Sequence, residues 1–131
     1  QGHSISEVLS LAGPEVKGVF SGASCRWIMS EHKRGVRGNM PACTIADIDS
    51  QIWDLLEAGD EEKAREVFNA KIILENALGS MPARRARKEI MVRRGVLSQP
   101  YGRNLGGEKL DEVDLAELDY ALAKVEPYFR L

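Results

Sequence analysis

Apolar residues recur at helical spacing from the start of the chain. Ile5, Val8, Leu9 and Ala12 follow the i, i+3, i+4, i+7 pattern of one helix face. The Gly13-Pro14 pair comes next, and such a pair ends helices because proline lacks an amide donor and clashes with the preceding turn. The pattern predicts a first helix that ends before this pair.

Two short segments that follow have the composition of strands. Val16–Phe20 is rich in β-branched and aromatic side chains, and Val36–Cys43 is a second short extended run. Small residues at 21–24 predict a loop between them, and a short helix is expected from Arg26 to the glycine at Gly35. Strand, loop, helix and strand make a βαβ unit, whose strands pair in parallel through a right-handed crossover. A parallel sheet needs both of its faces covered by other elements. Two strands alone do not meet this requirement.

The rest of the chain is predicted to be helical. The four expected helices run from a cap at Thr44 or Asp47 to Ala58, from Asp60 to Gly79, from Ala83 to Arg94, and from Asp114 to the residues before Pro127. Gly59, Gly79 and Gly95 are expected to end the first three of these helices. Asp114 with Glu117 is expected to form a capping box, and the segment 98–109, rich in glycine, is expected to be a loop.

Length and composition agree with one folded domain. The chain has 131 residues, of which 44% are hydrophobic and 29% charged, values close to the average for globular proteins. No apolar run approaches the ~18–20 residues that cross a bilayer, and no signal-peptide pattern opens the chain. A cytoplasmic location is therefore expected. The formal net charge of -2 gives no overall field toward nucleic acid or anionic lipid, so neither nucleic acid nor membrane is expected as a partner.

Charge is nevertheless distributed unevenly. The basic side chains of one segment are Arg84, Arg85, Arg87, Lys88, Arg93 and Arg94, and the acidic side chains of another are Asp111, Glu112, Asp114, Glu117 and Asp119. No aromatic residue interleaves with the arginines, as it does in sites that stack bases. The two clusters are therefore interpreted as solvated helix faces that complement each other, in preference to an RNA or phosphate site.

Single reactive residues offer little chemistry on their own. Cys25 and Cys43 are expected to be free, buried thiols, because a chain of this size forms a core without disulfides. His32 and the two cysteines have no recognised metal-ligand spacing, so no metal is expected. Lys17 has the amine that a Schiff base requires, but its place in an alternating strand favours a solvated edge position.

The first residues are interpreted as foreign to the protein and are left out of the fold prediction. Gln1-Gly2-His3 resembles the remnant of a cleaved affinity tag, and no methionine begins the chain. We therefore expect residues 1–3 to be foreign and the remaining residues to be a piece of something longer.

Several short motifs are informative as an ordered set. They are Val19-Phe20-Ser21-Gly22, then Glu31, then RGVRGNMPA from Arg34 to Ala42, then LLEAGD from Leu55 to Asp60, and then Lys88-Glu89 with Arg93-Arg94-Gly95-Val96. Each motif alone is weak. In this order and at this spacing they resemble the C-terminal portion of the dihydrodipicolinate synthase and N-acetylneuraminate lyase family. The resemblance extends from Ile5 to Leu131.

The resemblance implies a fold and a division of the chain. The family fold is a (β/α)₈ TIM barrel followed by a small helical region, and this chain resembles the last third of it. Val16–Ser21 is then the seventh strand and Val36–Ala42 the eighth, so residues 4–44 form the end of the barrel. Residues 45–131 are the last barrel helix and the appended helices. The expected class is therefore α/β, the C-terminal third of a barrel, mainly helical as an isolated chain.

The resemblance also implies a chemistry whose main groups lie elsewhere. In this family a lysine on the sixth strand condenses with pyruvate or another 2-oxo acid, and a tyrosine on the fifth strand relays protons. Both positions precede Ile5, so no catalytic residue and no cofactor are expected in this chain. The complete enzyme is expected to be a homo-oligomeric aldolase or dehydratase. The alternative, from a different class, is a helical interaction or oligomerisation module without enzymatic activity.

Substrate-binding residues are expected at the carboxyl ends of the two strands, where barrel active sites lie. Ser21, Gly22 and Met40 occupy these ends, and the resemblance implies that they contact the keto acid through backbone groups and shape. A tight turn after a strand and a core methionine are the alternative interpretation of the same residues.

Overall fold

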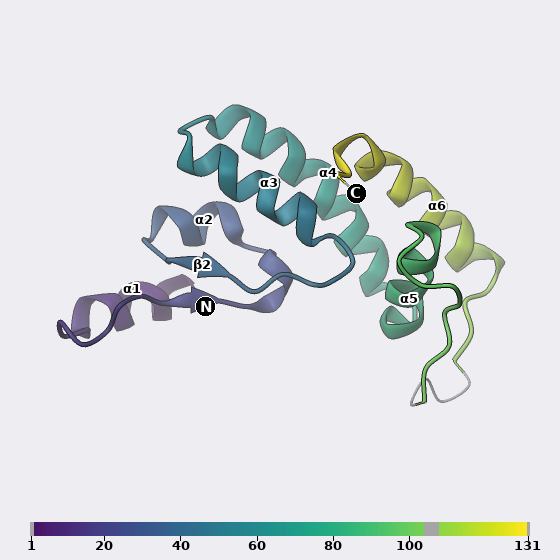
Figure 1. Ribbon diagram of the computed structural model, residues 1–131, viewed down its shortest axis with the longest axis horizontal. Coiled ribbons are helices and arrows are strands. Elements are labelled where there is room, and N and C mark those ends of the chain that lie inside the picture. The colour runs from purple at the N-terminus through teal and green to yellow at the C-terminus, as the bar shows by residue number, and fades with distance from the viewer. Residues whose placement is uncertain (1, 104–107, 131) are drawn as a thin grey trace. The chain divides into compact units, whose positions relative to one another are not determined.

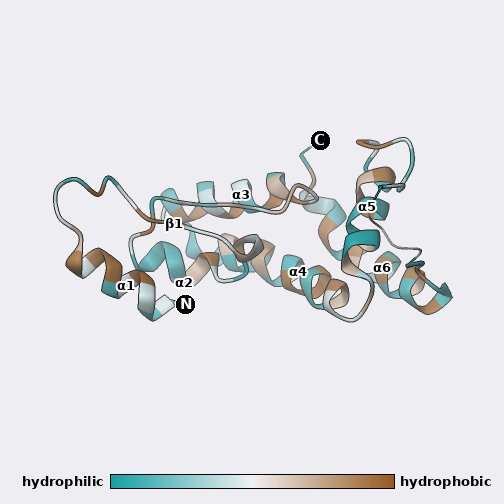
Figure 2. Cartoon of the chain, turned by 90° about the horizontal axis from the view of Figure 1, so that it is seen from below, coloured by the Kyte–Doolittle hydropathy of each residue, from teal (hydrophilic) through white to brown (hydrophobic). Residues whose placement is uncertain are grey.

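A computed structural model describes residues 2–103 and 108–130 of the chain (Figure 1). The described residues are mainly helical and contain two short strands. They divide into two compact units, Gln1–Arg65 and Glu66–Leu131. Hydrophobic and hydrophilic residues alternate along the helices, as expected for helices with one buried face (Figure 2).

The first unit contains the predicted βαβ arrangement. Helix α1 (Gly2–Leu11) precedes strand β1 (Phe20–Ser21), helix α2 (Ile28–Lys33) follows it, and strand β2 (Gly38–Asn39) comes next. The two strands are parallel, with Phe20 opposite Gly38 and Ser21 opposite Asn39. Helix α3 (Ala46–Glu57) and the start of helix α4 complete the unit. The parallel pairing confirms the βαβ prediction.

The strands are shorter than predicted. Regular pairing covers two residues of each strand, although the sequence pattern predicts Val16–Ser21 and Val36–Ala42. Single hydrogen bonds continue the pairing on either side, from the Arg37 amide to the Val19 carbonyl at 2.8 Å and from the Met40 amide to the Ser21 carbonyl at 2.7 Å. Among the described residues each strand pairs with only the other, so the sheet has two strands.

The core of the first unit forms where α2 packs against α1 and α3. The side chains that are at most 1% exposed there include Ile28 from α2, Ile45 before α3, and Ile48 and Ile52 from α3. Ile5 is the buried residue of α1, whereas Val8 on the same predicted face is 50% exposed. Helix α1 includes Gly2 and His3, whose origin as tag residues stays a prediction.

The secondary-structure elements described in the second unit are all helical. It consists of most of α4 (Glu61–Gly79), α5 (Ala83–Arg93) and α6 (Glu112–Val125), followed by a short 3-10 turn at Glu126–Tyr128. Its core is made by Leu74, Leu78, Ala86, Ile90, Leu118, Ala121 and Val125, all at most 2% exposed. An ion pair between Arg93 and Asp119 links one residue of the predicted basic cluster to one residue of the predicted acidic cluster. That the two faces complement each other more widely stays a prediction.

Helix boundaries agree with the predicted ones to within a few residues, but several end signals differ. Gly59 and Gly95 have the left-handed φ of glycine after a helix, +78° and +72°, as predicted. Helix α3 starts after Ile45 without a side-chain cap, so a cap at Thr44 or Asp47 is wrong. The predicted loop at 98–109 is without helix or strand where described, and its Gly106 and Gly107 lie outside the described residues.

The predicted start of α6 also differs from the observed one. Asp111 caps this helix, accepting a hydrogen bond from the Asp114 amide at 2.8 Å, and the Asp114 carboxylate accepts from the Asp111 amide at 3.2 Å. The capping box is therefore Asp111 with Asp114, and the predicted pair of Asp114 with Glu117 is displaced by three residues.

Candidate functional site

The carboxyl ends of β1 and β2 lie at the same edge of the parallel pair. Ser21 is opposite Asn39, and the Met40 amide donates to the Ser21 carbonyl at 2.7 Å. Gly22 and Met40 follow the two strands, and a Cβ placed on Gly22 would lie 3.6 Å from the Met40 methyl carbon. The structure therefore places Ser21, Gly22 and Met40 together at one edge. That these residues contact a substrate stays a prediction.

Alternation along the strands separates polar from apolar side chains. Ser21 is buried and Asn39 half-buried, and both hydrogen-bond to α2. Phe20 and Met40 are 62% and 60% exposed, on the face turned away from this helix. The Phe20 ring covers Gly38, because a Cβ there would stand 2.6 Å from a ring carbon. The exposed face of the strand pair is therefore apolar.

One buried carboxylate joins the polar side chains of the two strands. Glu31, on α2, is 0% exposed. Its Oε1 accepts a hydrogen bond from the Ser21 hydroxyl at 2.5 Å, and its Oε2 accepts one from the Asn39 side-chain amide at 3.0 Å. A donor on each oxygen offsets part of the cost of removing a carboxylate from water. The network connects α2 to both strand ends.

Glu31 and Asn39 are not among the site residues predicted from sequence. The available signal is the position of Glu31 three residues after Ile28, on the face that α2 buries. An acidic residue at a buried helix position requires hydrogen-bond donors nearby. The pattern does not identify those donors, because Ser21 and Asn39 are ten and eight residues away and meet Glu31 only in the folded chain.

The backbone after Ser21-Gly22 makes an unusual turn. Ala23, Ser24 and Cys25 have φ angles of 56°, 54° and 55°, all in the left-handed region that glycine prefers. Each such residue costs about 1–2 kcal/mol relative to the right-handed conformation. The small side chains of Ala23 and Ser24 limit crowding in this turn. The strain lies directly after the carboxyl end of β1, and the surrounding contacts must hold it in place.

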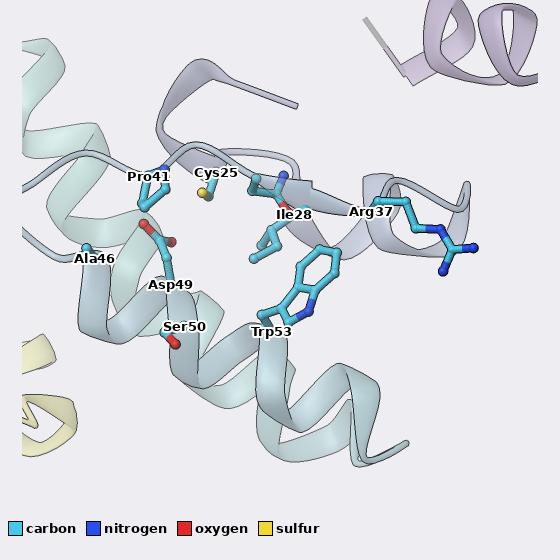
Figure 3. A pocket seen from close by; sticks show the side chains of 10 residues that line it. Cys25, Ile28, Arg37, Pro41, Ala46, Asp49, Ser50 and Trp53 are labelled. Carbon is cyan, nitrogen blue, oxygen red and sulfur yellow. The ribbon is translucent and has the colours of Figure 1, made fainter. Parts of the chain in front are cut away.

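A cavity of about 280 Å³ lies between α3 and the segment around β2. Its polar lining includes Asn39, Asp49 and Ser50, and its apolar lining includes Ile28 and Trp53. Asp49 and Trp53 extend from α3 toward the segments that carry Pro41 and Ile28 (Figure 3). The Asn39 Oδ1 atom is buried without a hydrogen-bond partner among the described residues.

The isolated reactive residues lie apart from one another. Lys17 is exposed, and its ammonium group donates to the Pro14 carbonyl at 3.2 Å. It precedes β1 rather than lying within a strand, so its predicted edge position is wrong although its exposure agrees. Neither Cys25 nor Cys43 is in a disulfide, but only Cys25 is buried, which corrects the prediction for Cys43. Residues 2–103 and 108–130 contain no group of three metal-ligating side chains.

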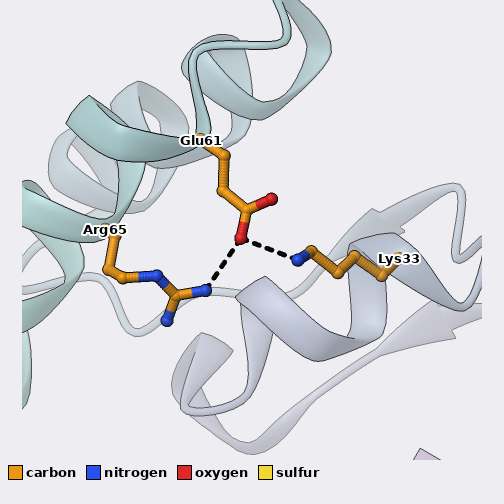
Figure 4. Close-up of polar contacts among 3 residues, drawn as sticks. All are labelled: Lys33, Glu61 and Arg65. Atoms are coloured by element: carbon orange, nitrogen blue, oxygen red, sulfur yellow. Dashed lines mark hydrogen bonds and ion pairs between the residues drawn. The ribbon is translucent and has the colours of Figure 1, made fainter.

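Ion pairs at the end of α2 connect this helix to its neighbours. Glu61 Oε1 accepts from the Lys33 ammonium at 2.7 Å and from the Arg65 guanidinium at 2.9 Å (Figure 4). The hydrogen bond from Lys33, followed by that from Arg65, lowers the pKa of Glu61. His32 Nε2 lies 2.7 Å from Glu57 Oε1, and its ring contacts Trp53 edge to face. These contacts link α2 to α3 and to the start of α4.

The fold resembles part of a known enzyme. The structure superposes on a dihydrodipicolinate synthase from Rhodopseudomonas palustris with a TM-score of 0.82 and 22% sequence identity. The alignment covers 94% of this chain and 42% of the synthase chain, so this chain spans less than half of the enzyme it resembles. The sequence matches no protein-family model and no curated protein sequence. The likeness therefore establishes a dihydrodipicolinate synthase-like fold for these residues.

The described helices include none suited to a bilayer. None combines the length and the apolar character needed to cross a membrane.

Proposed function

We propose that this chain is the C-terminal part of a Schiff-base-forming lyase, similar to dihydrodipicolinate synthase, that acts on pyruvate or another 2-oxo acid. The observation that carries the proposal is the likeness of 94% of the chain to part of such an enzyme. In the proposed fold, residues 4–44 close the barrel with its last two strands. Residues 45–131 are the last barrel helix and the appended helices.

The proposed reaction begins when a lysine amine attacks the ketone carbon of the 2-oxo acid. Loss of water then gives an imine, whose protonated form accepts the electron pair released when a C–H or C–C bond at the neighbouring carbon breaks. The enamine formed in this way donates that pair when a new bond forms at the same carbon. By the resemblance, this lysine lies on the sixth strand and the proton-relaying tyrosine on the fifth, both before Ile5. Lys17 lies at the seventh strand in this register, not the sixth, so it does not take over the role of the catalytic lysine.

The proposed contribution of this chain is to shape one wall of the active site. Ser21, Gly22 and Met40 lie at the carboxyl ends of the strands, where barrel enzymes bind their substrates. The Ser21 hydroxyl is turned toward Glu31, so Ser21 acts through its backbone. Gly22 and the Met40 side chain lie next to each other at this edge, where the 2-oxo acid is proposed to contact them. The complete enzyme is proposed to be a cytoplasmic homo-oligomer.

The experiment that tests the proposal starts from the gene. Reading the codons before Ser4 decides between the two classes: we expect an upstream barrel with a lysine on its sixth strand, and a start codon there favours the interaction module. The full-length protein is then incubated with pyruvate and borohydride, which reduces an imine to a stable adduct. We expect a mass increase on a lysine upstream of Ser4. An adduct on Lys17, or none on the full-length protein, contradicts the proposal.

A further inference from the structure

Glu31 occupies a position where a carboxylate is costly. It is 0% exposed on α2, and its helix neighbours Ile28 and Met29 are 1% and 6% exposed. An apolar side chain of similar size would fill the space without the desolvation cost, and such replacements are often neutral or stabilising. Filling the core therefore does not explain why a carboxylate is present here. Its two oxygens, which fix the positions of two hydrogen-bond donors, explain it better.

That geometry links two strands that are otherwise weakly held. The Ser21 hydroxyl and the Asn39 amide, which bind opposite oxygens of Glu31, come from residues paired in register. Each strand has two residues in the ladder, and two-stranded sheets of this length are marginal without further support. Glu31 supplies support from the helix side, at the last pair before the strands end.

The residues beyond this pair make the support more important. The left-handed turn at Ala23–Cys25 begins two residues after Ser21, and strained backbone persists only where its surroundings hold it. On the other strand, Met40 follows Asn39 directly and lies against Gly22. Loss of the Glu31 contacts releases Ser21 and Asn39 together. Gly22 and Met40, which follow them in the chain, are then no longer held in fixed positions.

We infer that Glu31 is a positioning residue, which clamps the carboxyl ends of β1 and β2 and thereby fixes the Gly22–Met40 edge against which the 2-oxo acid binds. The clamp follows from the contacts of this chain, whereas its role toward substrate rests on the proposed function. Glu31 does not touch the substrate in this arrangement, because its side chain lies between α2 and the strands.

A donor–acceptor exchange tests the clamp. In the native pair the Asn39 amide donates to the Glu31 carboxylate. Glu31→Ala removes both hydrogen bonds, and Asn39→Asp places two carboxylates against each other. The double variant Glu31→Gln with Asn39→Asp reverses the direction of the bond, and the Gln oxygen still accepts from Ser21. Glu62→Gln, at an exposed position of α4, is the matched control.

The first measurement is the amide hydrogen exchange of Met40, whose N–H closes the last hydrogen bond of the pair. We expect exchange about tenfold faster or more in Glu31→Ala and Asn39→Asp, since a buried donor or carboxylate loses its partner. In the double variant and in Glu62→Gln, the Met40 amide should exchange at a rate within about twofold of that in the parent chain. Equal exchange in all variants, or a double variant as fast as Asn39→Asp, overturns the clamp. If Glu31→Ala does not fold, the Asn39→Asp and double variants still decide the question.

The second measurement separates this inference from the proposed function. In the full-length protein, Glu31→Ala should raise KM for the 2-oxo acid about tenfold while the imine can still be trapped and kcat changes less. Faster exchange at Met40 with an unchanged KM overturns the role toward substrate and leaves the proposed function intact. A full-length parent protein that forms no imine overturns the proposed function, and the exchange measurement still decides on the clamp.

Discussion

Two glycines show, at the scale of single residues, how the same amino acid ends a helix in different ways. Gly59 follows α3 with a φ of +78°, whereas Gly79 is the last residue of α4 and has no left-handed φ. A Cβ added at either glycine would meet nothing within 4 Å. Any difference between alanine substitutions at the two sites therefore reports backbone conformation and not crowding.

We predict that Gly59→Ala destabilises the protein and that Gly79→Ala does not. A left-handed φ costs a residue with a Cβ about 1–2 kcal/mol, so Gly59→Ala should lower the free energy of unfolding by about that amount. Gly79→Ala exchanges glycine for a better helix former and should be neutral or stabilising by up to about 1 kcal/mol. Urea unfolding measures both, and equal losses would show that conformation is not the cause.

The candidate site is predictable only in part at this scale. Ser21, Gly22 and Met40 can be named from sequence because strand ends and the order of motifs are local features of the chain. The hydrogen bonds of Glu31 cannot, since they depend on how α2 lies against both strands. Cys43 shows the same limit, because burial depends on the neighbours that the fold supplies, and this cysteine is exposed.

At the scale of elements, the start of α6 gives a prediction that separates the observed cap from the predicted one. Asp111 accepts a hydrogen bond from the Asp114 amide, while Glu117 lies beyond the first turn and is exposed. Asp111→Ala should lower the free energy of unfolding by about 1 kcal/mol, the usual value of an N-cap. Glu117→Ala should change it by less than about 0.5 kcal/mol. Thermal unfolding compares them, and a larger loss in Glu117→Ala would contradict the assigned cap.

The junction of α2 and α4 predicts a dependence of stability on pH. Hydrogen bonds from Lys33 and Arg65 lower the pKa of Glu61, so the folded state favours the ionised carboxylate. The resulting stabilisation is complete above the ordinary pKa of glutamate and is lost as the pH falls through the lowered pKa. Glu61→Gln should therefore be less stable than the parent at neutral pH and equal to it in acid. Because the side chains are about half exposed, added salt should reduce the difference. Glu62→Gln serves as the control, and a constant difference across pH would argue against this cause.

The elements themselves are largely predictable, and the reason is visible in their residues. Helices α3 to α6 carry apolar residues at helical spacing over long segments, which identifies them and leaves only their ends uncertain. The strands are harder, because a ladder of two residues depends on a partner strand that no local pattern encodes. Val16–Val19 has the composition of a strand, yet regular pairing starts only at Phe20.

At the scale of the whole molecule, the register of the strands bears on what the isolated chain can do. We predict that the 131-residue chain gives no adduct with pyruvate and borohydride, because an imine mechanism needs an amine at the reacting carbon. Lys17, the lysine nearest in sequence to β1, is exposed, and its amine donates to the Pro14 carbonyl. Mass spectrometry of peptides after reduction is the measurement, and the full-length protein provides the positive control. A mass increase on Lys17 would contradict both this prediction and the proposed register.

The exposed face of the strand pair predicts association of the isolated chain. Phe20 and Met40 are 62% and 60% exposed beside strands that each have a single neighbour among the described residues. Such a surface combines an apolar patch with backbone groups open to pairing, and a second copy of the chain can cover both. We therefore expect a dimer or larger species at micromolar concentration.

Light scattering tests this association with matched variants. Phe20→Ser and Met40→Ser should shift the population toward monomer, because each removes apolar area from the patch. Leu11→Ser is the control, since Leu11 is 79% exposed but lies on α1 and not on the strands. A parent chain with a clean mass near 14.5 kDa, and with residues 16–42 resistant to protease, would contradict the prediction. That result would mean that the strand edges are satisfied within one chain, whereas a monomer cleaved readily in this segment would mean that the helices after residue 44 fold without it.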